Sequence, residues 1–121
     1  MTINFRAEEL DSAADFEESL LGLPSAQPES GDIKVRTYMA FGSDDEKIVS
    51  GSWESDPGTA RWEFTDRGEF IQVIAGRMVV QQDGEDPVEL TAGSTAVFPI
   101  GWTGTWTVLE PLRKVFVVYR P

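Results

Sequence analysis

Two carboxylates, Glu63 and Glu69, lie six residues apart across a predicted turn and are the best candidates for chemistry in this chain. A carboxylate pair can bind a hard cation, although two ligands without imidazole make a weak site. It can also serve as general acid and base when one group raises the pKa of the other. We favour a third interpretation, in which Arg61 neutralises both carboxylates within a buried polar cluster.

The 121 residues include neither cysteine nor histidine. Disulfides, thiolate nucleophiles, His-based catalytic triads and imidazole or thiolate metal ligands are therefore excluded. We expect no cofactor. A divalent metal would have to bind through Glu63 and Glu69, because the usual His ligands are absent.

The charge is strongly acidic, with ten basic residues against 21 acidic ones and a net charge of −11. Nucleic acids and anionic membranes are bound through basic faces, so we expect neither as a partner. No apolar stretch approaches the roughly 20 residues of a membrane-spanning helix, and the first residues lack a signal-peptide core. We expect a soluble cytoplasmic protein.

From residue 32 onward, apolar and polar residues alternate with the two-residue period of half-buried strands. Turns rich in Gly and Pro separate these segments, which predicts an all-β sandwich or small barrel. Gly76, between two apolar segments, is expected to take the positive φ of a tight hairpin. The predicted strands are 33–41, 47–53, 60–65, 70–75, 77–82, 88–90, 95–98, 104–109 and 114–119.

The acidic residues are concentrated near the start of the chain, where the first 32 residues hold eight of them and one base. We predict an acidic N-terminal arm over residues 1–31 and a barrel domain over 32–121. Within the arm, residues 6–21 have the apolar pattern of a short helix and residues 24–31 are typical of a linker. The arm could be a partner-binding helix, but we favour packing against the barrel or a second subunit.

Two segments of the predicted strands carry a specific spacing. Glu69 is followed after six residues by Gly76, and Gly93 is followed by five residues, Pro99, one residue and Gly101. This pair of spacings resembles the two motifs of the cupin superfamily, whose fold is the RmlC-like jelly roll. The resemblance implies a single antiparallel β-barrel.

The segment after the second motif indicates which branch of the superfamily this chain resembles. The run Gly101–Trp106, with Arg113 and Lys114 after it, is similar to the branch that includes the cupin domain of (S)-ureidoglycine aminohydrolase and the ethanolamine-utilisation cupin. The likeness covers about residues 47–119, and it implies a homodimer.

Metal-binding cupins supply a His-x-His pair and a Glu from the first motif and another His from the second. The resemblance puts the Glu on Glu69 and the last His on Gly104. Counting back from Glu69, it puts the His pair on Glu63 and Thr65, or on Trp62 and Phe64 if the gap between the pair and the Glu is one residue longer. Among the usual ligands only Glu69 is present, although aminohydrolase cupins also have a Glu where this chain has Glu63.

The two gaps turn opposite faces of one strand toward the barrel interior. With the shorter gap, Arg61, Glu63 and Thr65 line the interior, and with the longer one Trp62 and Phe64 do. A slip of one residue exchanges the faces completely. In either case Trp106 shares a face with Gly104, and if that face points inward, Trp106 partly fills the space that a metal would need.

The remaining candidates are aromatic or basic. The four tryptophans could form a cage for a cationic or planar ligand, but we favour a role in the core. Lys114 and Tyr119 lie on opposite faces of the last strand, so at most one enters the barrel, where Lys114 would pair with Glu63 or Glu69 or hold a substrate carboxylate. The candidate pocket residues are Arg61, Trp62, Thr65, Trp102, Trp106, Lys114 and Tyr119, and the candidate catalytic residues are Glu69 and Glu63.

These observations support two main functions. We expect a metal-free or weakly metal-binding barrel that binds a small molecule and forms a homodimer. The alternative, implied by the resemblance, is a metal-dependent hydrolase or isomerase acting on a small nitrogen- or carboxylate-containing metabolite. A third hypothesis is an interaction module that works through the acidic arm.

Overall fold

The computed structural model describes all 121 residues and confirms the all-β prediction. A three-residue 3₁₀ helix, η1 (Ala7–Glu9), is the one helical element, and the chain has no helix with the length and apolar character needed to cross a membrane. The strands are β1 (Glu17–Leu20), β2 (Ala26–Pro28), β3 (Lys34–Gly42), β4 (Ile48–Ser55), β5 (Gly58–Glu63), β6 (Gly68–Gln82), β7 (Val88–Thr91), β8 (Thr95–Phe98) and β9 (Thr103–Tyr119).

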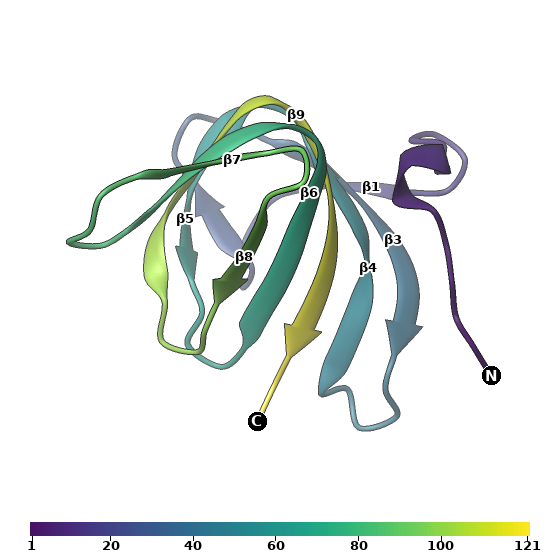
Figure 1. Ribbon diagram of the computed structural model, residues 1–121. Coiled ribbons are helices and arrows are strands. Elements are labelled where there is room, and N and C mark those ends of the chain that lie inside the picture. The colour runs from purple at the N-terminus through teal and green to yellow at the C-terminus, as the bar shows by residue number, and fades with distance from the viewer.

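Two long strands, β6 and β9, organise the fold. They pair with each other in antiparallel fashion along their lengths, and each bends so that its two halves lie in different sheets (Figure 1). The first sheet has the order β1-β3-β4-β9-β6-β8, and the second has the order β2-β5-β9-β6-β7. The result is the curled, barrel-like jelly roll that the motif spacing implies.

The bend of β6 corrects the predicted hairpin at Gly76. The segments 70–75 and 77–82 form one strand, and 104–109 and 114–119 likewise form one strand with their intervening residues. Gly76 does have a positive φ of 89°, but it lies in a bulge where the register between β6 and β9 shifts. A Cβ at this position would collide with the carbonyl of Pro111, so glycine permits the close approach of two strands rather than a chain reversal.

The core lies between the two sheets and is largely aromatic. Phe64 and Phe98 stack with ring centroids 5.5 Å apart, and Trp62 and Trp106 stack at 4.0 Å. The side chains of these four residues are almost completely buried. Alternation along each strand therefore turns the largest apolar groups inward, as the two-residue period predicts.

The predicted helix in the acidic arm is wrong. β1 pairs with β3, so its backbone groups find partners in the sheet, and the preceding turn is closed by Asp11, whose Oδ1 accepts hydrogen bonds from the N–H groups of Ala13 and Ala14 at 2.9 and 2.8 Å. The predicted linker at 24–31 also contributes a strand, β2, which pairs with β5. The arm thus packs against the barrel, as favoured from its sequence.

Candidate functional site

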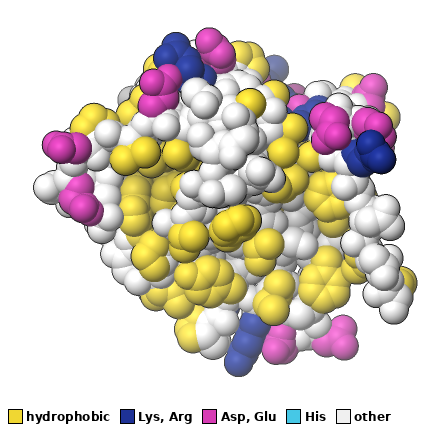
Figure 2. All heavy atoms as spheres, in the orientation of Figure 1, with side chains coloured by type: hydrophobic (Ala, Val, Ile, Leu, Met, Phe, Trp, Pro, Cys, Tyr) yellow, Lys and Arg dark blue, Asp and Glu magenta, His cyan; other side chains and the backbone are white.

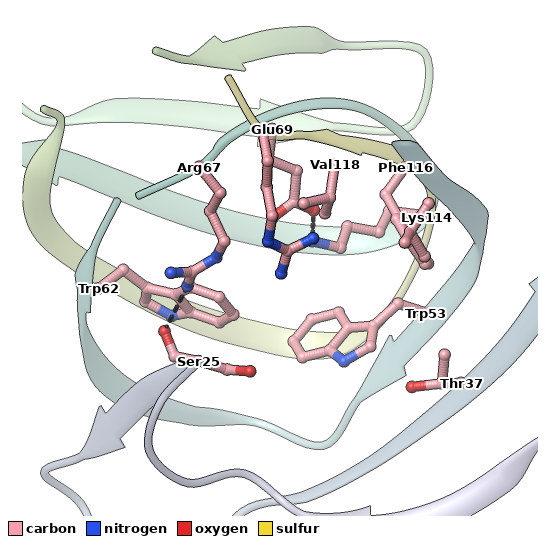
Figure 3. Close-up of a pocket in the computed structure, with 11 residues that line it drawn as sticks. Ser25, Thr37, Trp53, Trp62, Arg67, Glu69, Lys114, Phe116 and Val118 are labelled. Carbon is pink, nitrogen blue, oxygen red and sulfur yellow. Dashed lines mark hydrogen bonds and ion pairs between the residues drawn. The ribbon is translucent and has the colours of Figure 1, made fainter. Parts of the chain in front are cut away.

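A cavity of about 210 Å³ opens between the sheets, beside the aromatic core (Figure 3). Residues from β4, β5, β6 and β9 form its walls, and Ser25 of the arm and Thr37 of β3 lie at its edge. The lining residues are Ser25, Thr37, Val49, Trp53, Trp62, Arg67, Glu69, Lys114, Phe116, Val118 and Arg120.

Strand β5 turns Trp62 toward this cavity. This decides between the two spacings to Glu69 that the sequence left open, in favour of the longer one. Trp62 and Phe64 are 5% and 0% exposed, whereas the neighbouring Glu63 and Thr65 are exposed. The alternative with Arg61, Glu63 and Thr65 inside is therefore wrong. Its physical cost explains this outcome, because it would bury two charged side chains and expose two aromatic rings.

Arg61 forms its ion pair on the outer surface. Its guanidinium donates to both carboxylate oxygens of Asp83, at 2.8 and 2.6 Å, and more weakly to Glu63 at 3.4 Å. The hydrogen bonds from Arg61 and from Thr103 lower the pKa of Asp83 to about 2. Arg61 therefore does not neutralise Glu63 and Glu69 in a buried cluster.

The buried charge pair is instead Lys114 with Glu69. The Lys114 ammonium donates to Oε2 of Glu69 at 2.6 Å, and the two residues are 2% and 4% exposed. Burial lowers the pKa of Lys114, and the adjacent Glu69 carboxylate acts in the opposite direction. Glu69 was one of two partners that the sequence allowed for an inward Lys114.

Three tryptophans surround the Lys114 ammonium. Its Nζ lies 4.5 Å from the ring centroids of Trp53 and Trp106 and 5.8 Å from that of Trp62. Trp53 stands nearly perpendicular to Trp62, at 82° and 6.1 Å, so the rings form an open cage. The cation in this cage is supplied by the chain itself, through attraction of the ammonium to the ring faces.

Arg67 is a pocket residue that the sequence analysis missed. It lies in the turn between β5 and β6, its guanidinium lies 4.9 Å from the centroid of the Phe64 ring, and it donates to the carbonyl of Ser25 at 2.9 Å. Figure 3 shows Arg67, Glu69 and Lys114 converging on the cavity that Trp53 and Trp62 line. The turn residues Asp66-Arg67-Gly68 give no local signal that one of them points inward.

The other candidates lie away from the cavity. Trp102 packs edge-on against Phe98, with centroids 5.0 Å apart, and faces a separate depression. Tyr119 lies on the outer face of β9 over Gly68, so Lys114 alone of the two enters the barrel. Trp106 belongs to the core and reaches the site only through its contact with the Lys114 ammonium.

The residues present do not fit the metal of other cupins. Trp62 and Phe64 occupy the positions of the His pair, and Gly104 has no room for a ligand, since a Cβ there would lie 2.6 Å from the Trp102 ring. The structure contains no group of three or more acidic side chains that could hold an ion. Glu69 is the only residue at these positions that could bind a metal ion, and its carboxylate is already paired with Lys114.

The jelly roll with these two glycine motifs defines a cupin. Residues 42–116 match the family described as the EutQ-like cupin domain, and the chain belongs to this family. No curated protein sequence shows significant similarity to it.

Solved structures agree with this assignment at the level of fold. EutQ from Clostridium difficile is 24% identical with a TM-score of 0.62, and the match covers 73% of this chain and 64% of that protein. A DUF861-family protein of unknown function from Pseudomonas syringae is 23% identical with a TM-score of 0.73, covering 90% of this chain and 46% of the other. The Cnp3 cupin domain of Schizosaccharomyces pombe is 10% identical with a TM-score of 0.64, covering 88% of each chain.

This chain therefore spans less than two thirds of the C. difficile protein and less than half of the P. syringae protein. The family match supports the ethanolamine-utilisation side of the resemblance and adds nothing for the aminohydrolase.

Proposed function

We propose that this cupin is a metal-independent protein that binds a small molecule in the cavity beside Lys114. The observation that carries the proposal is the Lys114–Glu69 pair. Glu69 is the one metal-ligand residue of the cupin motifs that this chain retains, and the Lys114 ammonium supplies the positive charge beside it that a metal ion would otherwise supply. A cavity of about 210 Å³ with aromatic walls and a few polar groups has the character of a small-ligand site. No feature of the site favours the hydrolase or isomerase alternative.

Metal content tests the first half of the proposal. Protein purified without chelator from metal-replete medium is expected to retain far less than one equivalent of any transition metal per chain. Elemental analysis measures this directly. Retention of about one equivalent of manganese, nickel or zinc would overturn metal independence and would make hydrolase assays the next step.

Tryptophan fluorescence tests the second half, because Trp53 and Trp62 line the cavity. A small-molecule screen should find compounds that change the emission in a saturable way without added metal. The change should be much smaller in Trp53→Phe and retained in Trp102→Phe, since Trp102 faces a different depression. A screen that finds no saturable response, or a response that depends on Trp102 instead, would contradict the proposal.

We also propose that the chain forms a homodimer through the outer face of its first sheet. Five strands place an uninterrupted cross-strand row there: Phe41, Ser50, Val117, Phe70 and Val97. The apolar members of this row are 38–56% exposed. The adjacent rows, Tyr38-Ser52-Val115-Gln72-Thr95 and Ile48-Tyr119-Gly68, also contain no charged residue.

A second copy fits this face better than a partner of another kind. Figure 2 shows hydrophobic and uncharged side chains across its middle and charged ones around its rim. Two chains of net charge −11 repel each other, and an uncharged face lets them meet without placing like charges in contact. With strands about 4.8 Å apart, the row spans roughly 19 Å across the sheet, and its four partly exposed apolar side chains form the patch that a second copy would cover.

A further inference from the structure

The cavity beside Lys114 carries a charge opposite to that of the whole chain. Arg67, Lys114 and Arg120 line it, against a single carboxylate, Glu69. Three of the ten basic residues are therefore gathered at one small site in a chain whose net charge is −11. Glu69 is neutralised by Lys114, and Arg67 forms an ion pair with Asp66 at 3.3 Å. Arg120 has no carboxylate partner, so the site keeps a net positive charge that attracts anions.

Hydrogen bonding at the site shows the same imbalance, since donors outnumber acceptors. An ammonium has three N–H donors, and Lys114 uses one of them, on Glu69. Arg67 has five N–H donors and directs its hydrogen bonds to the carbonyls of Ser25 and Glu63 and to Asp66.

A cationic ligand does not match this arrangement. The tryptophan cage that would bind one already holds the Lys114 ammonium, 4.5 Å from two ring centroids. A second cation would meet the charges of Lys114, Arg67 and Arg120 at close range. Because hydrogen-bond donors are in surplus, a matching ligand must carry hydrogen-bond acceptors. The rings of Trp53 and Trp62 favour a ligand whose remaining part is apolar and planar.

We infer that the cavity binds a small organic anion with a planar apolar body, an aromatic carboxylate in its simplest form. Its carboxylate accepts hydrogen bonds from Arg67 and Lys114, and its ring lies against Trp53 and Trp62. This inference rests on the proposed small-molecule-binding function and specifies the class of ligand for the same site.

Three compounds of nearly the same shape separate charge from shape: benzoate, benzamide and benzylamine. Titration of the full chain, followed by tryptophan fluorescence and by calorimetry, is expected to show saturable binding of benzoate. Benzamide should bind about ten-fold or more weakly, because it replaces charge-assisted hydrogen bonds with neutral ones. Benzylamine should not bind measurably.

Substitutions locate the site. Arg67→Gln is expected to weaken benzoate binding by about ten- to hundred-fold, the loss of one charge-assisted hydrogen bond. Arg77→Gln is the matched control, because Arg77 pairs with Glu89 and Glu110 on the outer surface, and it should bind benzoate as the parent chain does.

Lys114 requires a double variant, since removing it alone leaves Glu69 buried without its partner. The variant Lys114→Met, Glu69→Gln removes both charges, keeps the length of residue 69 and shortens residue 114 by one atom. It is expected to fold, with an unchanged far-UV circular dichroism spectrum, and to lose benzoate binding by at least about ten-fold.

Three results overturn the inference. Equal or tighter binding of benzamide or benzylamine shows that the ligand is not an anion, while the proposed small-molecule site stands. Failure of all three compounds to bind the folded parent chain also rejects the aromatic carboxylate, and the wider fluorescence screen then decides the proposed function separately. Benzoate binding that survives both Arg67→Gln and the double variant places the anion elsewhere and rejects this site.

Discussion

Lys114 and Glu69 form the most demanding interaction in the molecule, because both charges are removed from water. The 2.6 Å hydrogen bond and the faces of Trp53 and Trp106 compensate part of that desolvation. A buried pair of this kind is costly to assemble and more costly to break, since removal of one partner leaves the other unpaired.

At this scale we predict that Glu69→Gln lowers the free energy of unfolding by about 3 kcal/mol, because the Lys114 ammonium loses its counter-charge. Urea denaturation of the purified variant measures the change. Glu63→Gln is the control, because Glu63 is exposed on the outer face of β5. This substitution should change the free energy of unfolding by less than about 0.5 kcal/mol. Equal stabilities of the two variants would contradict a structural role for the buried pair.

At the scale of elements, a charged cluster holds the first residues of the N-terminal arm to the barrel, in addition to the pairing of β1 with β3 and of β2 with β5. Arg113 of β9 donates to the carbonyls of Ala7 and Leu10 at 2.7 Å, and to Glu54 of β4. Glu54 also accepts hydrogen bonds from Arg36 and from the Ser12 hydroxyl, both at 2.9 Å. One carboxylate thus ties two strands and the arm together.

Acidification should weaken this cluster. Burial raises the pKa of Glu54, but the hydrogen bonds from Arg113, Arg36 and Ser12 outweigh it and hold that pKa below its ordinary value of 4.5. The carboxylate therefore stabilises the fold fully above about pH 4.5, and its contribution is lost as the pH falls toward the folded-state pKa, because the unfolded chain takes up the proton first.

The measurement is thermal unfolding of the parent chain and of Glu54→Gln. The substitution should cost about 2 kcal/mol near pH 6, and the difference between the two proteins should narrow steadily toward about pH 3. A difference that stays constant over this range would show that the charge of Glu54 has no role in stability.

The bend of β6 is the second feature at this scale. Gly76→Ala should lower the free energy of unfolding by more than about 3 kcal/mol, because the methyl group meets the Pro111 carbonyl in addition to the strain of a positive φ. Gly84→Ala supplies the strain alone, since Gly84 has a φ of 81° and open space around it. It should cost about 1 kcal/mol in urea denaturation, and similar losses in both variants would contradict the role given to the Pro111 contact.

At the scale of the whole molecule, the distribution of charge separates two faces of the first sheet. The inner face carries Lys114, Glu69 and the aromatic cavity, whereas the outer face carries the uncharged rows that include Phe41, Phe70 and Val97. The arm covers only one side of that outer face, where the rings of Phe5 and Phe16 pack on Tyr38. The rest is left open to a second copy.

We predict that light scattering at micromolar concentration gives twice the 13.4 kDa mass of one chain. Phe70→Glu should give a monomer, because a two-fold interface would bring two added carboxylates close together. Leu109→Glu replaces a residue of similar exposure outside the face and should remain dimeric. A monomeric parent chain would reject the proposed dimer, and dimers in both variants would reject this face.

The alternation of apolar residues was sufficient to predict the all-β class and the extended segments from residue 33 onward, because side chains on a strand must face opposite sides in turn. It did not predict β1 and β2, which lie before that residue. The glycine spacings were sufficient to predict the cupin fold, and the absence of histidine was visible from composition alone. Local pattern could not tell a bend from a hairpin at Gly76. That distinction depends on whether β6 and β9 continue to pair beyond the glycine, which is a contact between residues distant in sequence.

The sequence by itself thus determined the fold class, most of the extended segments of the barrel and the set of chemical groups available. Only the tertiary structure decided which face of β5 is buried, that Lys114 pairs with Glu69, and that Arg67 reaches the cavity from a turn. The physical reason is that both faces of β5 carry residues able to line a barrel, and a one-residue change of register exchanges them. The choice between them comes from burying aromatic rings and exposing charges across the whole core, a sum that no single segment contains.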